Sequence, residues 1–142
     1  MTNLNIYTEK LRQSGLRPTK QRLKICEVLF SPEKTFHFTI NDLTKIIEEK
    51  LSKKISLATV YNTVHAFKKK SYLKEISINS DKSYFDTNIT GHHHFFDEDT
   101  NELIDCSSDD IDSVNIKQNI TGKKIKSVEV LIKVATDNQT QK

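Results

Sequence analysis

The stretch Ser56–Lys70 (SLATVYNTVHAFKKK) constrains the fold of this chain more than any other. Apolar side chains recur along it at steps of three and four residues, which predicts a helix with one buried face. Those side chains are Leu57, Val60, Val64 and Phe67. The opposite face is small and polar, with Asn62 at its centre and lysines at its end. One interpretation is a surface helix that packs by one face, and the other is a helix that reads DNA.

A helix with this outer face fits the major groove of DNA. The methyl groups of Ala58 and Thr59 can contact thymine, Asn62 can hydrogen-bond to adenine, and the terminal lysines can contact phosphates. Tyr61 lies on the shoulder of the same face, and Ser56 is placed to cap the first turn. We therefore assign candidate DNA contacts to these residues of the helix.

Charge is divided unevenly along the 142 residues. Residues 1–86 carry 16 Lys/Arg and 9 Asp/Glu, a net charge of +7, whereas residues 87–142 carry 6 and 10, a net charge of −4. A basic half is expected to approach a polyanion, and an acidic half is expected to be kept away from it. The candidate reading helix lies in the basic half, so both observations favour double-stranded DNA as a partner.

The composition also bears on location. No apolar run approaches the roughly 18 residues of a membrane span, and no signal-peptide pattern opens the chain. Cys26 and Cys106 make no disulfide framework and are expected to be small buried thiols. We therefore expect a cytoplasmic protein without a membrane partner.

The first half of the chain predicts a winged helix-turn-helix domain, residues 1–86. Helical patterns precede the reading helix at residues 3–14, 19–30 and 40–51. Thr39 and Asp42 predict a capping box, and residues 36–38 are expected to be a connector.

A hairpin follows the reading helix, because the side-chain period changes to two. Strands are predicted over 73–78 and 83–86, joined by the turn Asn79–Lys82. This hairpin is the wing, and Lys82 at its tip is a candidate contact to a phosphate or the minor groove.

The second half predicts a hinge at 87–91, a small α/β domain at 92–136 and a loose tail at 137–142. Its expected elements are strands at 92–96, 102–106 and 127–134 and a helix at 107–119. The whole chain is thus of the α+β class. A unit of this size buries too little surface to be secure alone, so pairing with a second copy would stabilise it. A homodimer also matches a palindromic DNA site.

Three consecutive histidines, His92, His93 and His94, stand on a predicted strand. Side chains alternate across a strand, so His92 and His94 point one way and His93 the other. His93 could belong to a second site or be an axial ligand to haem iron. The alternative is a partly exposed strand with no metal.

Acidic residues flank the triplet. Asp86 precedes it at the predicted domain junction, Asp105 ends the partner strand, and His37 lies in the basic half. Such a mixed nitrogen and oxygen set suits Fe(II), Mn(II) or Zn(II) better than soft-metal chemistry. It differs from a closed tetrahedral thiolate zinc site.

Three segments together resemble the ferric uptake regulator superfamily. They are LRPTKQR from Leu16, SLATVYNTV from Ser56 and YFDTNITGHHHFF from Tyr84. The histidine triplet after YFDTN is most similar to the iron response regulator branch. The resemblance covers Leu16 to about Asp112 and implies a winged-helix domain hinged to a small dimerisation domain.

The resemblance also implies roles for individual residues. The implied regulatory metal ligands are His37, Asp86, His92, His94 and Asp105, and the implied haem-sensing residues are His92, His93 and His94. Tyr61 is implied to read bases, and Arg17 and Lys20 to lie near the DNA backbone. Where most members carry a Cys-x-x-Cys pair for structural zinc, this chain has Asp97 and Thr100, so no structural zinc site built from four cysteines is expected.

These patterns predict a non-enzymatic, homodimeric transcriptional regulator that binds an AT-rich inverted repeat. Its affinity is expected to depend on iron, sensed as haem or Fe(II). A peroxide-sensing or metal-only repressor is the close alternative. A metal-dependent hydrolase is a different class, which the lack of a recognisable general base disfavours, and an adaptor that dimerises without binding DNA is another.

Overall fold

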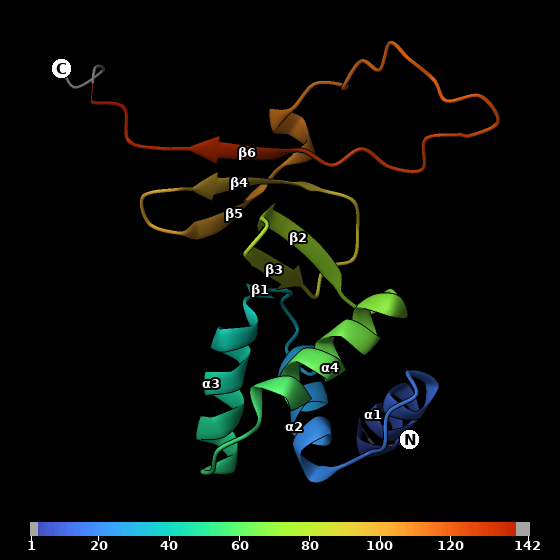
Figure 1. The fold of residues 1–142 in the computed structure, drawn as a ribbon, viewed down its shortest axis with the longest axis vertical. Coiled ribbons are helices and arrows are strands. Elements are labelled where there is room, and N and C mark those ends of the chain that lie inside the picture. The colour runs from blue at the N-terminus through green and yellow to red at the C-terminus, as the bar shows by residue number, and fades with distance from the viewer. Residues whose placement is uncertain (1–2, 139–142) are drawn as a thin grey trace. The chain divides into compact units, whose positions relative to one another are not determined.

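Residues 3–138 are described by this computed structural model, in which the chain forms two compact units, Met1–Ile89 and Thr90–Lys142 (Figure 1). The division falls inside the segment 87–91. Residues 139–142 of the expected loose tail lie outside the described residues. No helix among the described residues is long and apolar enough to cross a membrane.

Four helices make up most of the first unit: α1 (Asn3–Gln13), α2 (Lys20–Phe30), α3 (Ile40–Leu51) and α4 (Leu57–Lys69). Three of them begin directly after a hydroxyl cap. The side chains of Thr19, Thr39 and Ser56 accept hydrogen bonds from backbone N–H groups of the first turns of α2, α3 and α4. The capping box of α3 is present in full, with the Asp42 carboxylate accepting from the Thr39 backbone N–H. The predicted helices of the first half are therefore confirmed.

A small antiparallel sheet completes this unit, with strand order β1-β3-β2. Its strands are β1 (His37–Phe38), β2 (Lys74–Asn79) and β3 (Lys82–Asp86). The β2–β3 hairpin is the predicted wing. The expected connector at 36–38 is wrong in part, because two of its residues pair with the end of β3. That pairing joins positions about 50 residues apart and leaves no local signal in the sequence.

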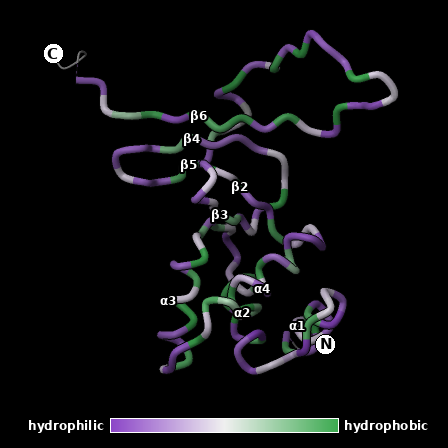
Figure 2. Tube along the Cα trace, viewed as in Figure 1, coloured by the Kyte–Doolittle hydropathy of each residue, from purple (hydrophilic) through white to green (hydrophobic). Residues whose placement is uncertain are grey.

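The core of the first unit lies between its helices and the sheet. Val60, Val64 and Phe67 of α4 are fully buried, as the apolar stripe predicts, and apolar positions recur along the helices in Figure 2. Leu57 is an exception, because its side chain is 53% exposed. It stands in the first turn of α4, where the prediction of burial from the stripe is wrong. Thr63, which has no place in the stripe, is fully buried and donates to the Thr59 carbonyl at 2.7 Å.

The second unit is a three-stranded sheet of order β5-β4-β6. Its strands are β4 (His93–Asp97), β5 (Glu102–Cys106) and β6 (Leu131–Val134). β4 pairs antiparallel with β5 and parallel with β6. Phe96, Leu103 and Cys106 are buried together with His94. This small core leaves the unit few apolar side chains to hold it together.

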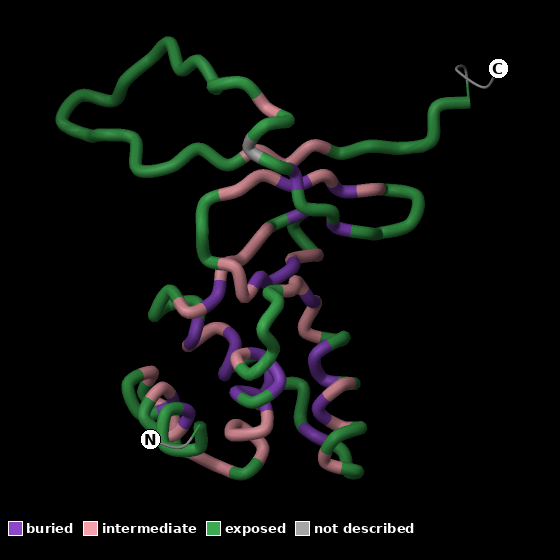
Figure 3. Tube along the Cα trace, turned by 180° about the vertical axis from the view of Figure 1, so that it is seen from behind, coloured by how far each residue is buried: buried purple, intermediate pink, exposed green. Residues whose placement is uncertain are grey.

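The helix expected at 107–119 is wrong. Only a 3-10 turn, η1 (Ser108–Asp110), forms there, and Ile111 is already extended with φ −129° and ψ 122°. The following residues are irregular and exposed through residue 129, as Figure 3 shows for the long segment after β5. Its many Asp, Ser, Asn and β-branched residues are poor helix formers, and a short helix needs packing to form. The strand expected at 127–134 is also shorter, because only its last four residues pair with β4.

Candidate metal centre and DNA-binding surface

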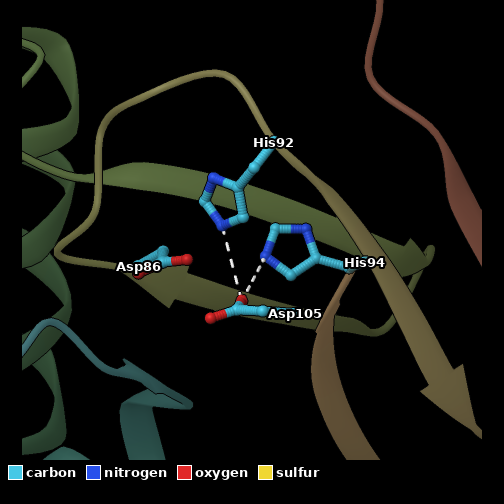
Figure 4. Close-up of side chains that lie close together, drawn as sticks. All are labelled: Asp86, His92, His94 and Asp105. Carbon is cyan, nitrogen blue, oxygen red and sulfur yellow. Dashed lines mark ion pairs between the residues drawn. The ribbon is translucent and has the colours of Figure 1, made fainter. Parts of the chain in front are cut away.

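Two histidines and an aspartate converge in the second unit. His94 on β4 and Asp105 on β5 are cross-strand partners, and His92 lies just before β4 on the same side as His94. Asp105 Oδ1 is 3.4 Å from His92 Nε2 and 3.3 Å from His94 Nε2, and Figure 4 shows both rings turned towards this oxygen. The alternation predicted for the strand thus brings His92 and His94 together.

The spacing of these three groups fits a metal ion. Ligand bonds of about 2.0–2.2 Å place neighbouring ligand atoms roughly 3.0–3.5 Å apart around an ion. The two measured separations fall in this range, and the three residues offer ligand atoms within 4.8 Å of one another. Two imidazoles and one carboxylate suit Fe(II), Mn(II) and Zn(II) alike.

A hydrogen bond to a backbone carbonyl favours the His92 tautomer whose Nε2 can bind a metal. His92 Nδ1 lies 2.8 Å from the Thr90 carbonyl oxygen, which can only accept, so Nδ1–H is the donor. In the neutral ring the lone pair is then on Nε2, the atom that faces Asp105. Sequence reasoning did not anticipate this contact between Thr90 and His92.

His93 is turned away from the cluster. Its Nδ1 accepts a hydrogen bond from the Val130 backbone N–H at 2.9 Å. A neutral ring that accepts at Nδ1 carries its proton on Nε2 and has no lone pair left for a metal. In this structure His93 therefore holds β4 to the segment before β6.

The two remaining predicted ligands belong to the first unit. His37 of β1 and Asp86 of β3 are cross-strand partners there. Asp86 is 1% exposed, and its Oδ1 accepts a hydrogen bond from the Asn88 backbone N–H at 2.8 Å. The His37 ring lies edge-on to Tyr84, with 6.4 Å between ring centroids. The pairing of β1 with β3 thus places His37 and Asp86 opposite each other in the strand register.

Most of the predicted DNA-contacting residues in α4 and at its N-cap are exposed. Ser56, Ala58, Tyr61 and Asn62 are exposed, and Thr59 is half-buried. Arg17 and Lys20, at the entry to α2, are exposed as well. Lys82 at the start of β3 is half-buried, with Nζ 5.5 Å from the Tyr84 ring centroid.

A family model described as the ferric uptake regulator family matches residues 13–134. This chain belongs to the ferric uptake regulator family. The match covers most of both units, including every predicted metal and DNA-contacting residue.

Curated relatives in this family carry two kinds of name. The peroxide operon regulator of Bacillus subtilis is 31% identical over 118 residues, which are 82% of this chain and 79% of that protein. The ferric uptake regulation protein of Pseudomonas fluorescens is 31% identical over 113 residues, which are 79% of this chain and 90% of that protein. Both iron and peroxide regulators are thus similar to this chain.

Solved structures of the family share the fold. The ferric uptake regulator of Pseudomonas aeruginosa with manganese matches with a TM-score of 0.65 at 21% identity, covering 94% of this chain and 99% of that one. The peroxide stress regulator of Campylobacter jejuni matches with a TM-score of 0.59 at 20% identity, covering 98% and 99%. The α+β class with a winged helix and a C-terminal domain is therefore confirmed.

The sequence places His65 on the same helix as the candidate DNA contacts, as a DNA-proximal or surface residue rather than a metal ligand, but does not reveal its contact with Tyr61. His65 is half-buried, and its ring lies tilted against that of Tyr61, with ring centroids 4.1 Å apart. Both rings line a cleft of about 440 Å³ beside α4. The spacing of four residues between two aromatic rings on one helix is the signal that could have revealed the pair.

Proposed function

We propose that this protein is an iron-responsive transcriptional regulator that binds operator DNA as a homodimer. The observation that carries the proposal is the convergence of His92 Nε2, His94 Nε2 and Asp105 Oδ1 at ligand spacing. The basic first half with an exposed, small and polar face on α4 supports the DNA partner. The relatives named as ferric uptake and peroxide regulators support the same class of function.

The proposed ligand set is His92, His94 and Asp105 with Asp86 and His37. Asp86 and His37 are already neighbours across β1 and β3, and only five residues separate Asp86 from His92 in the chain. When bound, the ion supplies a positive charge that holds imidazole nitrogens and carboxylate oxygens together. Because these ligands come from both sides of residues 87–91, metal binding would restrict the hinge and favour one spacing of the two reading helices.

A more specific version of this proposal is that the protein senses iron as haem, as in the iron response regulator branch. In that form its ligands come from His92, His93 and His94. Use of His93 at the ring nitrogens requires loss of its hydrogen bond with Val130 or of the Nε2 proton. The metal proposal needs no such change at His92.

Peroxide sensing is a second candidate, which the names of the relatives favour. Besides the Bacillus protein, the peroxide-responsive repressor PerR of Staphylococcus epidermidis is 31% identical over 112 residues. Asp105 has a side chain that is 61% exposed, which leaves the centre open to a small oxidant. Mass spectrometry after Fe(II) and peroxide would show oxidation at His92 or His94 if this candidate is right.

Fluorescence anisotropy on an AT-rich inverted-repeat duplex tests the proposal. The full chain is titrated without metal, with Mn(II) or anaerobic Fe(II), and with haemin. The double variant His92→Ala, His94→Ala is expected to lose the metal response, whereas His93→Ala is the matched control that keeps it. Haemin-dependent weakening together with a histidine-ligated Soret band would support the haem form.

The salt dependence of the affinity in the same titration tests for contacts with DNA phosphates. Phosphate contacts make the logarithm of the affinity fall steeply with the logarithm of salt concentration. A flat salt dependence would contradict the proposed function. So would a lack of duplex binding in all of the titrations, without metal, with Mn(II) or Fe(II), and with haemin.

A further inference from the structure

The cleft beside α4 has walls of mixed chemistry. Ser14, directly after α1, lines it together with the aromatic residues Tyr61 and His65 and the polar residues Asn62 and Lys69 of α4. The volume is about 440 Å³, and all of these residues lie in the first unit. The cleft therefore opens on the same helix face that carries the candidate DNA contacts.

His65 connects the buried core to the exposed Tyr61. Its ring lies edge-on to Phe85 of β3, with centroids 5.8 Å apart and planes at 75°. On its other side it lies against Tyr61, with centroids 4.1 Å apart and planes at 36°. Phe85 is 2% exposed and is itself stacked on Phe38, so one end of this series of rings is held by the core.

The contact with His65 supports an exposed aromatic residue, Tyr61. Tyr61 is 51% exposed, and within residues 3–138 its ring contact is with His65. Fixing an exposed aromatic side chain before binding removes part of the entropy cost of ordering it in a complex. A Tyr61 ring that is already oriented against His65 would lose less conformational entropy when it contacts a base.

We propose that His65 is a positioning residue for DNA recognition, whose ring, held against Phe85, fixes the orientation of Tyr61. The DNA partner in this inference rests on the proposed function. A direct contact of His65 with DNA is a different role, and it requires the imidazole nitrogens. The positioning role requires only a flat ring at residue 65.

Two substitutions separate these roles in the full chain with saturating Mn(II). His65→Phe keeps the ring and removes the nitrogens, whereas His65→Ala removes both. Aromatic pairs contribute enough that His65→Ala is expected to weaken duplex binding by roughly 2- to 12-fold. His65→Phe is expected to bind as the wild type does. Thr35→Ala, in the exposed loop before β1, is a neutral control.

A double-mutant cycle with Tyr61→Ala adds a readout that a purely structural role would not move. If His65 acts through Tyr61, then His65→Ala has no further effect on DNA affinity in the Tyr61→Ala protein. An equal loss in His65→Phe and His65→Ala, or an effect of His65→Ala that persists without Tyr61, would overturn the proposal.

A measurement without DNA tests the positioning of Tyr61 independently of the proposed DNA-binding function. Tyr61 ring resonances are recorded by NMR in selectively tyrosine-labelled wild-type, His65→Phe and His65→Ala proteins. We expect the chemical shifts of the Tyr61 ring to move towards those of a freely mobile tyrosine in His65→Ala alone. Absence of duplex binding by the wild type would refute the DNA function, whereas unchanged Tyr61 resonances in His65→Ala would refute the positioning role by itself.

Discussion

His37 and Asp86 lie opposite each other where β1 pairs with the end of β3. On the other edge of β3, Lys74 of β2 is also a partner of Asp86. Asp86 thus ends the middle strand of its sheet, and it is 1% exposed. A buried carboxylate is costly unless it is hydrogen-bonded, paired or bound to a metal, and the Oδ1 of Asp86 accepts a hydrogen bond from the Asn88 backbone N–H.

Substitution of Asp86 distinguishes its structural role from its proposed metal role. Asp86→Asn keeps an oxygen that can accept from the Asn88 backbone N–H, so the fold should remain stable. It removes the negative charge, and we expect Mn(II) affinity to fall by about tenfold or more, as even outer-shell changes cost that much. Isothermal titration calorimetry measures the affinity, and chemical denaturation measures the stability.

Asp86→Leu is the matched comparison for that experiment. It leaves the Asn88 N–H without its acceptor, which costs about 1–3 kcal/mol of unfolding free energy. An Asp86→Asn protein with unchanged Mn(II) affinity would remove Asp86 from the ligand set.

Metal binding should stabilise the protein through His92 and His94 but not through His93. A ligand at about 100 times its dissociation constant stabilises the folded state by about 2.7 kcal/mol. We expect Mn(II) to raise the melting temperature of the wild type and of His93→Ala, and to have little effect on His92→Ala. Differential scanning fluorimetry with and without metal checks this. Loss of the shift in His93→Ala alone would place the ion on the other face of β4.

The pairing of Lys68 on α4 with Glu75 on β2 should give a pH-dependent contribution to stability. Burial favours a raised pKa for Glu75, but hydrogen bonds from Lys68 and Ser83 and the charge of Lys68 outweigh it, so the pKa lies below the ordinary 4.5. A lowered folded-state pKa stabilises the protein above the unfolded pKa, and this stability is lost as the pH falls through the folded value.

Glu75→Gln tests this contribution. Because the pair is partly exposed, we expect a loss of only about 0.2–1 kcal/mol at pH 7. The difference from the wild type should shrink once the pH falls below about 4.5, the ordinary glutamate pKa. Urea denaturation at a series of pH values measures it, and a difference that is the same at pH 3 and pH 7 would exclude the ion pair as its cause.

Cys26 should be chemically inert in the folded protein. It is fully buried in the core of the first unit, and this burial raises the pKa of its thiol to about 12. Only the thiolate reacts readily with alkylating reagents, so iodoacetamide at pH 8 should modify Cys26 only after denaturation. Peptide mass spectrometry checks this, with the unfolded protein as the reactive control. Rapid native labelling would show that the core opens around α2.

Local sequence determined much of the first unit. Thr19, Thr39 and Ser56 cap their helices, and Val60, Val64 and Phe67 form the buried stripe, because caps and helical periodicity act between residues three or four positions apart. The alternation that places His92 and His94 on one side of β4 is equally local. This alternation could therefore group His92 with His94, whereas the full set with His37, Asp86 and Asp105 was implied by the family resemblance.

Only the tertiary structure decided which distant groups meet. The pairing of His37 with Asp86, the register that sets His94 opposite Asp105, and the contact of His65 with Phe85 all join separate elements. The segment at 107–119 also shows that local sequence does not decide whether a helix forms. Its acidic first turn suggested a helix, but weak helix formers fold into a helix only when another surface covers their apolar face, and these residues are exposed.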